Sequence, residues 1–291
     1  MNRKDAVIRS WEDYELLDSG DGMKLERYGS IILARPETQA LWKKSKPEVW
    51  KEAHATFKWQ EGKGSWIYSK EIPESWTLKW GDVTFAVRPT LFKHTGVFPE
   101  QAANWEWLSE TIKSYRDVTS VKTNVLNLFG YTGIATLISV KAGAYVTHVD
   151  ASKQSLDWVH ENARLSGLPE ESIRYICDDA LGFAKREVRR GSHYEGIILD
   201  PPAFGRGPKG EVWKIEENLQ ELIEVTKELL TETLHSFYLL NGYAAGYGAV
   251  SFAQLIESFF GQVDGTYGDL NIQESHSDRV VTAGIYAHFL R

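Results

Sequence analysis

The chain contains almost no cysteine, and this limits the kinds of protein that it can be. Its 291 residues include one cysteine, Cys177. A single thiol cannot build a disulfide framework or a cysteine-rich zinc site. We therefore expect a cytoplasmic protein, in a reducing compartment, that depends on its hydrophobic core. The length is sufficient for one large domain, or for one domain with a small module.

Long hydrophobic segments are also scarce. The N-terminus is charged and has no apolar run of signal-peptide length. Residues 236–256 carry no formal charge and are long enough to suggest a membrane span, but three glycines, Asn241 and Gln254 interrupt them. We interpret this stretch as a strand, a loop over 242–248 and the start of a helix. No membrane association is expected.

An excess of positive charge is missing as well. The net charge is −7, which argues against strong unaided attraction to nucleic acid. The first hundred residues are close to neutral, and the acidic excess lies in the rest. Two interpretations of the densest basic run stay open, a handle for a polyanion and a solvated helix face. That run consists of Lys43, Lys44, Lys46 and Lys51.

Several catalytic motifs are absent. The eight histidines form no His-Glu-x-x-His pair, so we expect no catalytic metal. The sequence has no Gly-x-Ser-x-Gly nucleophile elbow and no phosphate-binding loop ending in Gly-Lys-Ser/Thr.

Residues 1–90 have the composition of a small β-rich module. Seven of the eleven tryptophans precede position 81, between frequent turn signals. Apolar and polar residues alternate over 30–35 and 83–88, as in strands, and we expect helical stretches after Pro36 and Pro47. The tryptophans could stack on bases, although such residues more often form the core of a small domain.

Residues 91–291 alternate between strand and helix patterns, which predicts a second, α/β domain. Repeated βα units favour a doubly wound, mostly parallel sheet. The two last runs suggest an antiparallel terminal hairpin. The expected strands are 125–129, 145–150, 173–177, 196–200 and 237–241, the hairpin covers 262–273 and 279–289, and the helices follow each of the five strands.

Acidic residues and a glycine turn mark the ends of these strands. The turn Asn127–Gly133 would let backbone approach a ligand at a helix N-terminus, although it also suits an ordinary tight βα turn. Asp150 ends the next strand, where a ribose diol is held in such folds. Asp179, or less favourably Asp178, could accept from an exocyclic amine, although aspartates here also cap helices. Together they indicate a nucleoside-type ligand.

The fourth of these strands ends in Asp200-Pro201-Pro202-Ala203-Phe204. The prolines fix φ and remove two donors, so the strand cannot continue and its acceptors face the ligand crevice. A planar amine could bind Asp200 with its ring against Phe204. The next six residues, Gly205–Gly210, contain three glycines and two cations, and are either a mobile lid that touches phosphate or a surface loop.

These motifs together resemble those of class I S-adenosylmethionine-dependent methyltransferases. The resemblance is closest to the bacterial family that modifies large-subunit ribosomal RNA. It covers residues 90–290 and includes the segment 95–101, Thr-Gly-Val-Phe-Pro-Glu-Gln. It implies a Rossmann-like, seven-stranded sheet. Two departures are that Ala102 replaces the arginine of the family, and that the N-terminal module does not resemble the RNA-binding domain of many relatives.

The resemblance also assigns roles to residues. The methionine end of the cofactor falls to Phe129, Gly130, Tyr131 and Gly133, the ribose to Asp150 and the adenine to Asp179. Asp200, Pro201, Pro202 and Phe204 form the catalytic set. The complete expected cofactor set is Phe98, Gln101, Asn127, Phe129, Gly130, Tyr131, Thr132, Gly133, Asp150, Ala151, Asp178, Asp179 and Ala180.

The atom that accepts the methyl group can be narrowed. Relatives that make 5-methylcytosine use a cysteine, commonly after the fifth strand. Here 240–244 reads Leu-Asn-Gly-Tyr-Ala, so an amine or ring nitrogen in RNA, ribosomal RNA above all, is favoured. Asn241 either orients the substrate or is a buried structural residue. A small molecule, a protein side chain, a nicotinamide-dependent oxidoreductase and a non-catalytic binding module stay open, as does a homodimer.

Overall fold

The computed structural model describes residues 1–60, 63–119, 122–243 and 246–291. The chain forms two compact units. We call the first the core unit; it comprises Met1–Ala6, Asn104–Asp269 and Gly284–Arg291. The second, the tryptophan-rich unit, comprises Val7–Ala103 and Leu270–Ala283.

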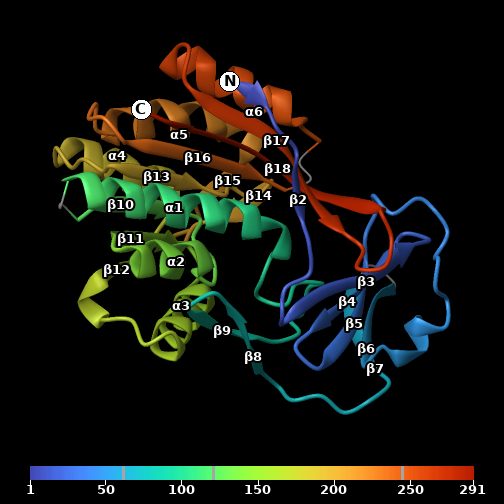
Figure 1. The fold of residues 1–291 in the computed structure, drawn as a ribbon. Helices are drawn as coiled ribbons and strands as arrows, with labels where there is room; N and C mark the ends of the chain where they lie inside the picture. The colour runs from blue at the N-terminus through green and yellow to red at the C-terminus, as the bar shows by residue number, and fades with distance from the viewer. Residues whose placement is uncertain (61–62, 120–121, 244–245) are drawn as a thin grey trace. The chain divides into compact units, whose positions relative to one another are not determined.

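A nine-stranded sheet has most of its residues in the core unit (Figure 1). Its order is β1-β17-β18-β16-β13-β10-β11-β12, and β2 also pairs with β17. The strands are β1 (Asn2–Arg3), β2 (Ala6–Ile8), β10 (Asn124–Leu128), β11 (Tyr145–Asp150), β12 (Ile173–Cys177), β13 (Gly196–Leu199), β16 (Phe237–Gly242), β17 (Gly265–Gln273) and β18 (Val280–Leu290).

Five neighbouring strands of this sheet, β16, β13, β10, β11 and β12, are parallel, and β18 runs antiparallel to β16. The mixed α/β fold expected from the sequence is thus confirmed. The sheet has nine strands where seven were expected. The additional strands, β1 and β2, are two and three residues long, too short to give a periodic pattern in the sequence.

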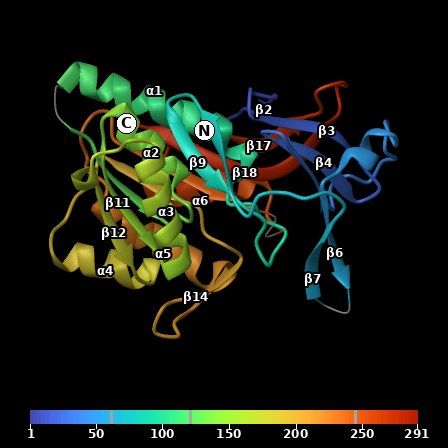
Figure 2. The ribbon, with the colours of Figure 1, turned by 90° about the horizontal axis from the view of Figure 1, so that it is seen from below.

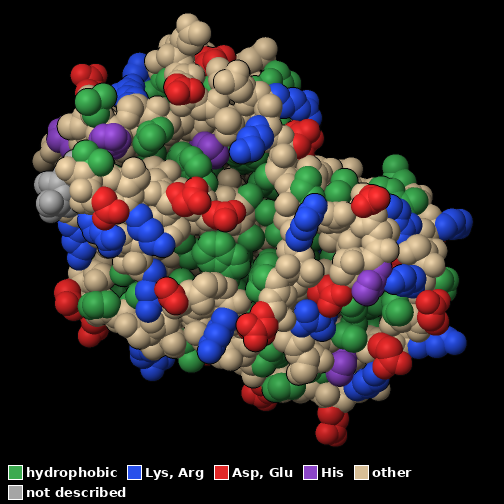
Figure 3. Space-filling model, viewed as in Figure 1, with side chains coloured by type: hydrophobic (Ala, Val, Ile, Leu, Met, Phe, Trp, Pro, Cys, Tyr) green, Lys and Arg blue, Asp and Glu red, His purple; other side chains and the backbone are tan. Residues whose placement is uncertain are grey.

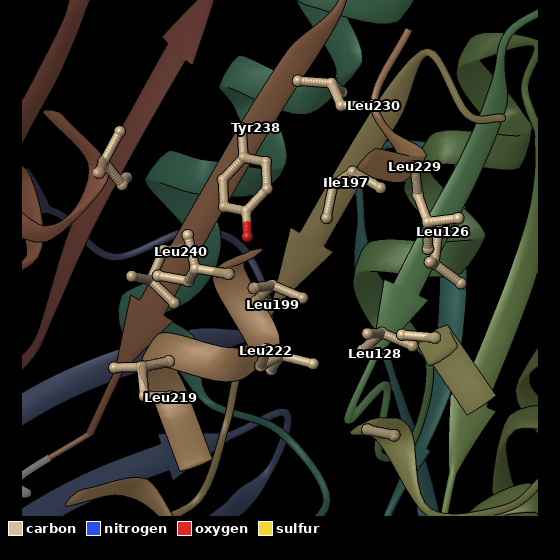
Figure 4. Close-up of a cluster of buried hydrophobic side chains, with 14 of the residues drawn as sticks. Leu126, Leu128, Ile197, Leu199, Leu219, Leu222, Leu229, Leu230, Tyr238 and Leu240 are labelled. Atoms are coloured by element: carbon tan, nitrogen blue, oxygen red, sulfur yellow. The ribbon is translucent and has the colours of Figure 1, made fainter. Parts of the chain in front are cut away.

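Six α-helices lie in the described part of the chain, and they cover both faces of the sheet (Figure 1). Leu126, Leu199 and Tyr238 face a cluster that includes residues of α4, α5 and α6 (Figure 4). Alternate residues face the other side of the sheet, where Phe237 contacts Trp107 of α1 and Asn127 donates to Thr136 of α2. The helices are α1 (Ala102–Thr119), α2 (Ile134–Ala142), α3 (Lys153–Leu165), α4 (Ala180–Arg189), α5 (Ile215–Leu229) and α6 (Ala249–Phe260).

The tryptophan-rich unit contains a five-stranded and a two-stranded sheet. Its indole N–H groups mostly find partners within the unit: Trp66 donates to the Thr90 carbonyl and Trp76 to the Tyr28 carbonyl. Trp59, by contrast, is exposed. The strands are β3 (Tyr14–Gly20), β4 (Met23–Tyr28), β5 (Ile31–Pro36), β6 (Ala55–Gln60), β7 (Lys63–Tyr68), β8 (Trp76–Trp80) and β9 (Val83–Val87).

The prediction of a helical stretch after Pro36 is wrong. The helical stretch predicted after Pro47 is a single 3-10 turn, Val49–Glu52. The reason is a set of long-range hydrogen bonds. The buried carboxylate of Asp18 accepts from the backbone N–H groups of Ser45 and Lys46, and from the indole of Trp50 at 2.7 Å. These bonds hold the segment in an irregular path.

The tip of the β17–β18 hairpin completes this unit. Glu274 accepts hydrogen bonds from the backbone and hydroxyl of Ser19, and Arg279 pairs with both Glu274 and Asp18. Burial would raise the pKa of Asp18, but the hydrogen bonds from Trp50, Ser45 and Lys46 hold it below its usual value. A C-terminal segment therefore supplies charged groups to the interior of an N-terminal unit.

The surface shown in Figure 3 carries acidic and basic side chains interspersed rather than segregated. Among the residues that the structure describes, no helix is both long and apolar enough to cross a membrane.

Candidate nucleoside-binding site

The glycine turn after β10 has an unusual backbone. Phe129 and Tyr131 have positive φ values of 59° and 50°, although neither is glycine, and Gly133 follows at 84°. Such conformations are rare for residues with a Cβ and are concentrated at functional sites. Within the turn, the Gly130 N–H donates to the Val149 carbonyl at 3.0 Å and the Gly133 N–H to the Gly130 carbonyl at 2.9 Å, so both hydrogen bonds hold the turn itself.

Buried side chains beneath the turn fix its shape. A Cβ on Gly130 would lie 2.3 Å from Cε1 of His148, so only glycine fits at that position. The imidazole Nδ1 of His148 lies 2.9 Å from the Thr136 hydroxyl, which also accepts from the Asn127 amide at 2.9 Å. Asn127 therefore lies under the turn as a support. Burial lowers the pKa of His148 to about 3, so its imidazole is neutral.

Thr132 is buried within the turn, and its carbonyl accepts from the amide of Asn162 on α3 at 2.9 Å. Gly133 is the N-cap of α2 and packs so closely on α3 that a Cβ would lie 2.1 Å from Val159. The turn is thus held from both of the helices that flank it.

Asp150 joins the turn to the next loop. Its carboxylate accepts from the backbone N–H of Tyr131 at 2.9 Å and from that of Ser152 at 2.8 Å. Burial raises the pKa of Asp150, while these hydrogen bonds act in the opposite direction. The Ser155 side chain adds a third hydrogen bond, and because a carboxylate has about four acceptor positions, the group keeps capacity to accept from a ribose hydroxyl. The structure therefore brings the turn and Asp150 together.

The two aspartates after β12 have structural partners. Asp179 is the N-cap of α4 and accepts from the Gly182 N–H at 2.7 Å, directly before the buried Ala180. Asp178 forms an ion pair with Arg186. The capping role that the sequence allowed is therefore present, with one carboxylate oxygen of Asp179 engaged in it. The carbonyl of Ala151 faces the thiol of Cys177 at 3.8 Å.

Asp200 follows β13, which pairs with β10 on the side opposite to β11. Its backbone N–H donates to the Leu128 carbonyl at 3.4 Å, near the start of the glycine turn. Because β10 lies between β11 and β13 in a parallel arrangement, Asp150 and Asp200 flank the same strand end. Pro201 is buried and Pro202 is exposed. This strand end lies beside the point where the strand order reverses, where open α/β sheets hold ligands.

Sequence reasoning missed Trp213. This buried residue lies in a short hairpin, β14 (Phe204–Arg206) and β15 (Val212–Lys214). Its indole N–H donates to the Pro202 carbonyl at 2.7 Å, and its ring lies 4.8 Å from that of Phe129. It therefore links the proline loop to the glycine turn. The alternation of Val212, Trp213 and Lys214 was the available signal.

The segment after Phe204 is the start of this hairpin rather than an irregular loop. Gly207 N–H donates to the Glu211 carbonyl at 2.8 Å, and Gly210 N–H to the Gly207 carbonyl at 3.1 Å. Phe204 is 55% exposed, with the Arg206 guanidinium carbon 5.9 Å from the centre of its ring. The Phe204 ring is thus accessible beside the Asp-Pro-Pro segment.

Four further residues that the sequence singled out lie outside the glycine turn and the Asp-Pro-Pro segment. Asn241 is buried, and its side-chain oxygen accepts from Asn104 at 2.8 Å, which supports the structural interpretation. Phe98 and Gln101 belong to the tryptophan-rich unit, where Gln101 N–H donates to the Phe98 carbonyl. Ala244, which ends the segment 240–244 after the fifth predicted strand, lies outside the described residues.

Two of the known proteins that match the sequence are ribosomal RNA large subunit methyltransferases. Over 173 residues the chain is 34% identical to the ribosomal RNA large subunit methyltransferase K/L of Syntrophotalea carbinolica, a match that covers 58% of this chain and 23% of that protein. It is 26% identical over 222 residues to methyltransferase K of Neisseria meningitidis, covering 72% and 60%. The chain thus spans less than two thirds of either relative. No family model matches the sequence.

A solved structure matches along the whole chain. The crystal structure of a S-adenosylmethionine-dependent methyltransferase from Agrobacterium tumefaciens is 37% identical, with a TM-score of 0.92, and the match covers 100% of this chain and 97% of that one. Fold and site together define a Rossmann-like α/β protein with its site at the carboxyl ends of the strands. The chain belongs to the S-adenosylmethionine-dependent methyltransferases. This membership replaces the oxidoreductase alternative.

Proposed function

We propose that this protein transfers a methyl group from S-adenosylmethionine to an amine or ring nitrogen of an RNA base, with ribosomal RNA as the favoured substrate. Two relatives that are named as methyltransferases of large-subunit ribosomal RNA support the substrate class. In this proposal, residues 91–291 form the methyltransferase domain that carries catalysis, and residues 1–90 form an accessory module.

The residues around the glycine turn fit the cofactor. Asp150 keeps acceptor capacity for the ribose diol, and the left-handed turn at Phe129 and Tyr131 would border the polar methionine end. Asp179 would accept from the adenine amine with the oxygen that does not cap α4. Gly130, Thr132, Gly133, Ala151 and Ala180 shape the walls. The cofactor, when bound, supplies an electrophilic methyl group on a sulfonium.

The observation that carries the proposal is the adjacency of the Asp-Pro-Pro loop and the glycine turn. Asp200 is hydrogen-bonded to Leu128, and Trp213 connects Pro202 to Phe129. In the proposal, the Asp200 carboxylate accepts a hydrogen bond from the target amine and orients its lone pair, while Phe204 stacks on the base. Such positioning can provide a large part of the catalytic effect.

Nitrogen is favoured over carbon because of where the thiol lies. Cys177 ends β12, which β10 and β11 separate from β13 in the sheet, and its thiol faces the Ala151 carbonyl. It is the only cysteine in the chain. Carbon methylation through a covalent adduct needs a cysteine on the substrate side of the site.

The test begins with RNA from cells that lack the gene. Purified protein and S-adenosylmethionine are added to that RNA, and modified nucleosides are identified by mass spectrometry. The variant Asp200→Asn keeps the shape of the side chain but removes its charge, and we expect the rate to fall by about 10²-fold or more. Asp157→Asn, at an exposed position on α3, is the matched control and should leave the rate unchanged.

A normal rate with Asp200→Asn would refute the role of that carboxylate. Methylation of a protein or small-molecule fraction, with none of RNA, would refute the substrate class while leaving the enzyme class intact. Formation of 5-methylcytosine would refute the nitrogen target.

A further inference from the structure

The β14–β15 hairpin has two chemically different faces. In this antiparallel pair, Phe204 lies opposite Lys214, Gly205 opposite Trp213, and Arg206 opposite Val212. Residues directly opposite each other point to the same side of a two-stranded ribbon, and successive pairs alternate. One face therefore carries Gly205 and Trp213, and the other carries the remaining four side chains.

The inner face anchors the hairpin to the core unit. Trp213 is 3% exposed and is part of the main hydrophobic cluster. Its hydrogen bond to the Pro202 carbonyl and its contact with Phe129 fix the ribbon beside the proposed substrate pocket. The Ile215 N–H adds a hydrogen bond to the Ala203 carbonyl at 3.0 Å.

The outer face is exposed and cationic. Phe204 is 55% exposed and Val212 49%, and they lie among the cations Arg206 and Lys214. The one acidic residue of the hairpin, Glu211, folds back onto the turn, where its carboxylate accepts from the Lys209 N–H at 2.8 Å. Lys214 pairs with Glu217 at 2.6 Å, an exposed contact of small strength. Figure 2 shows the hairpin, labelled at β14, at the margin of the core unit.

We propose that this outer face binds the single-stranded RNA next to the target nucleotide. Arg206 and Lys214 would bind the phosphates on either side of the base that stacks on Phe204, and Val212 would contact the neighbouring base. The proposal rests on the proposed function, and it adds the strand-binding surface and its residues.

Charge and shape favour RNA over an acidic peptide. The hairpin carries three cations, Arg206, Lys209 and Lys214, against the single acid Glu211, although the whole chain has a net charge of −7. Alternation of a ring with cations matches a strand in which bases alternate with phosphates. A single strand is required because stacking on Phe204 needs an unpaired base.

The experiment measures binding of a fluorescein-labelled, 15-nucleotide single-stranded RNA of mixed sequence by anisotropy over a salt series. The variants are Arg206→Ala/Lys214→Ala, the charge-preserving Arg206→Lys/Lys214→Arg, and Val212→Glu. Lys141→Ala, which removes an exposed cation at the end of α2, is the matched control. S-adenosylmethionine binding by calorimetry shows that each variant is folded.

We expect the double alanine variant to bind about tenfold more weakly, with a salt slope smaller in magnitude by about 1.4, because each phosphate contact to a single strand contributes about 0.7. Val212→Glu should also weaken binding, and the charge-preserving variant should retain most of it. Cofactor binding should be unchanged in all of them.

Equal losses for Lys141→Ala and the double alanine variant would overturn the proposal, because they would indicate unspecific attraction. Unchanged RNA binding by the double variant, in an enzyme that methylates RNA, would overturn it and leave the proposed function standing. Failure of the wild-type protein to methylate any RNA would refute the proposed function itself. Tighter binding of an acidic peptide than of the RNA would show that the surface serves a protein.

Discussion

At the residue scale, the site depends on contacts between a backbone position and the side chain beneath it. The sequence alone gives a reason for glycine at position 133, because that residue stands where a helix begins. It does not show that Gly130 is required because the His148 ring lies against it. The two residues are 18 positions apart, and only the parallel pairing of β10 and β11 brings them together.

The first prediction concerns Gly130→Ala. The new methyl group would collide with the buried imidazole of His148 and displace it from Thr136, so we expect a loss of about 1–3 kcal/mol in the free energy of unfolding and weaker cofactor binding. Urea denaturation and calorimetry measure the two effects. In a His148→Ser background the same substitution should cost less. An equal cost in both backgrounds would show that the contact is not the cause.

A second prediction uses the pKa of His148, which burial lowers to about 3 in the folded protein. In the unfolded chain this imidazole takes up a proton near pH 6.5, whereas in the folded protein it stays neutral down to about pH 3. The contribution of His148 to the free energy of unfolding is therefore fully present above pH 6.5 and is lost as the pH falls from 6.5 toward 3. His94 and His288, with pKa values of about 4 and about 3, act in the same direction.

The check is the free energy of unfolding from pH 5 to pH 7 for the wild-type protein and His148→Asn. Below pH 6 the wild-type slope should exceed that of the variant by at most about 1.4 kcal/mol per pH unit. Identical slopes would contradict a neutral, buried His148.

At the element scale, the terminal hairpin of β17 and β18 joins segments that are far apart in the sequence. The alternating runs of the terminal hairpin were predicted as strands close to where β17 and β18 lie. Their periodicity is local, so the sequence shows it. That the tip of this hairpin supplies Glu274 and Arg279 to the interior of the other unit depends on partners about 260 residues away, such as Asp18.

The third prediction therefore concerns Arg279→Met. It leaves the buried carboxylates of Asp18 and Glu274 without their guanidinium partner. We expect the free energy of unfolding of the tryptophan-rich unit to fall by about 2–3 kcal/mol, less than for a fully buried pair because Arg279 is partly exposed. Tryptophan fluorescence in urea measures it. Lys43→Met, at the exposed pair with Asp21, should change little, and equal effects would refute the argument.

At the scale of the whole molecule, the two units do not follow the order of the chain. The sequence suggested a boundary near residue 90, whereas the compact units exchange Met1–Ala6 and Leu270–Ala283. Composition changes along the chain indicate where a module begins. They carry no information about a distant segment that completes it, because that contact needs only a few well-placed side chains.

The fourth prediction follows from this arrangement. Residues 7–103 expressed alone should show no cooperative unfolding, since Ser19 and Asp18 lose Glu274 and Arg279. Joining residues 270–283 to the fragment through a glycine-serine linker should restore a transition, monitored by circular dichroism during heating. A cooperative transition of the unmodified fragment would show that the hairpin tip is dispensable.

The homodimer that the sequence left open stays a prediction.

The sequence by itself determined the order of strands and helices, the glycine turn and the acidic residues at the strand ends. These features follow from hydrophobic periodicity and from the chemistry of single residues, which are local properties. Only the tertiary structure decided that Trp213 joins Pro202 to Phe129, that His148 requires Gly130, and that the terminal hairpin completes a distant unit. Each of these depends on segments that meet only when the sheet has formed and its side chains have packed.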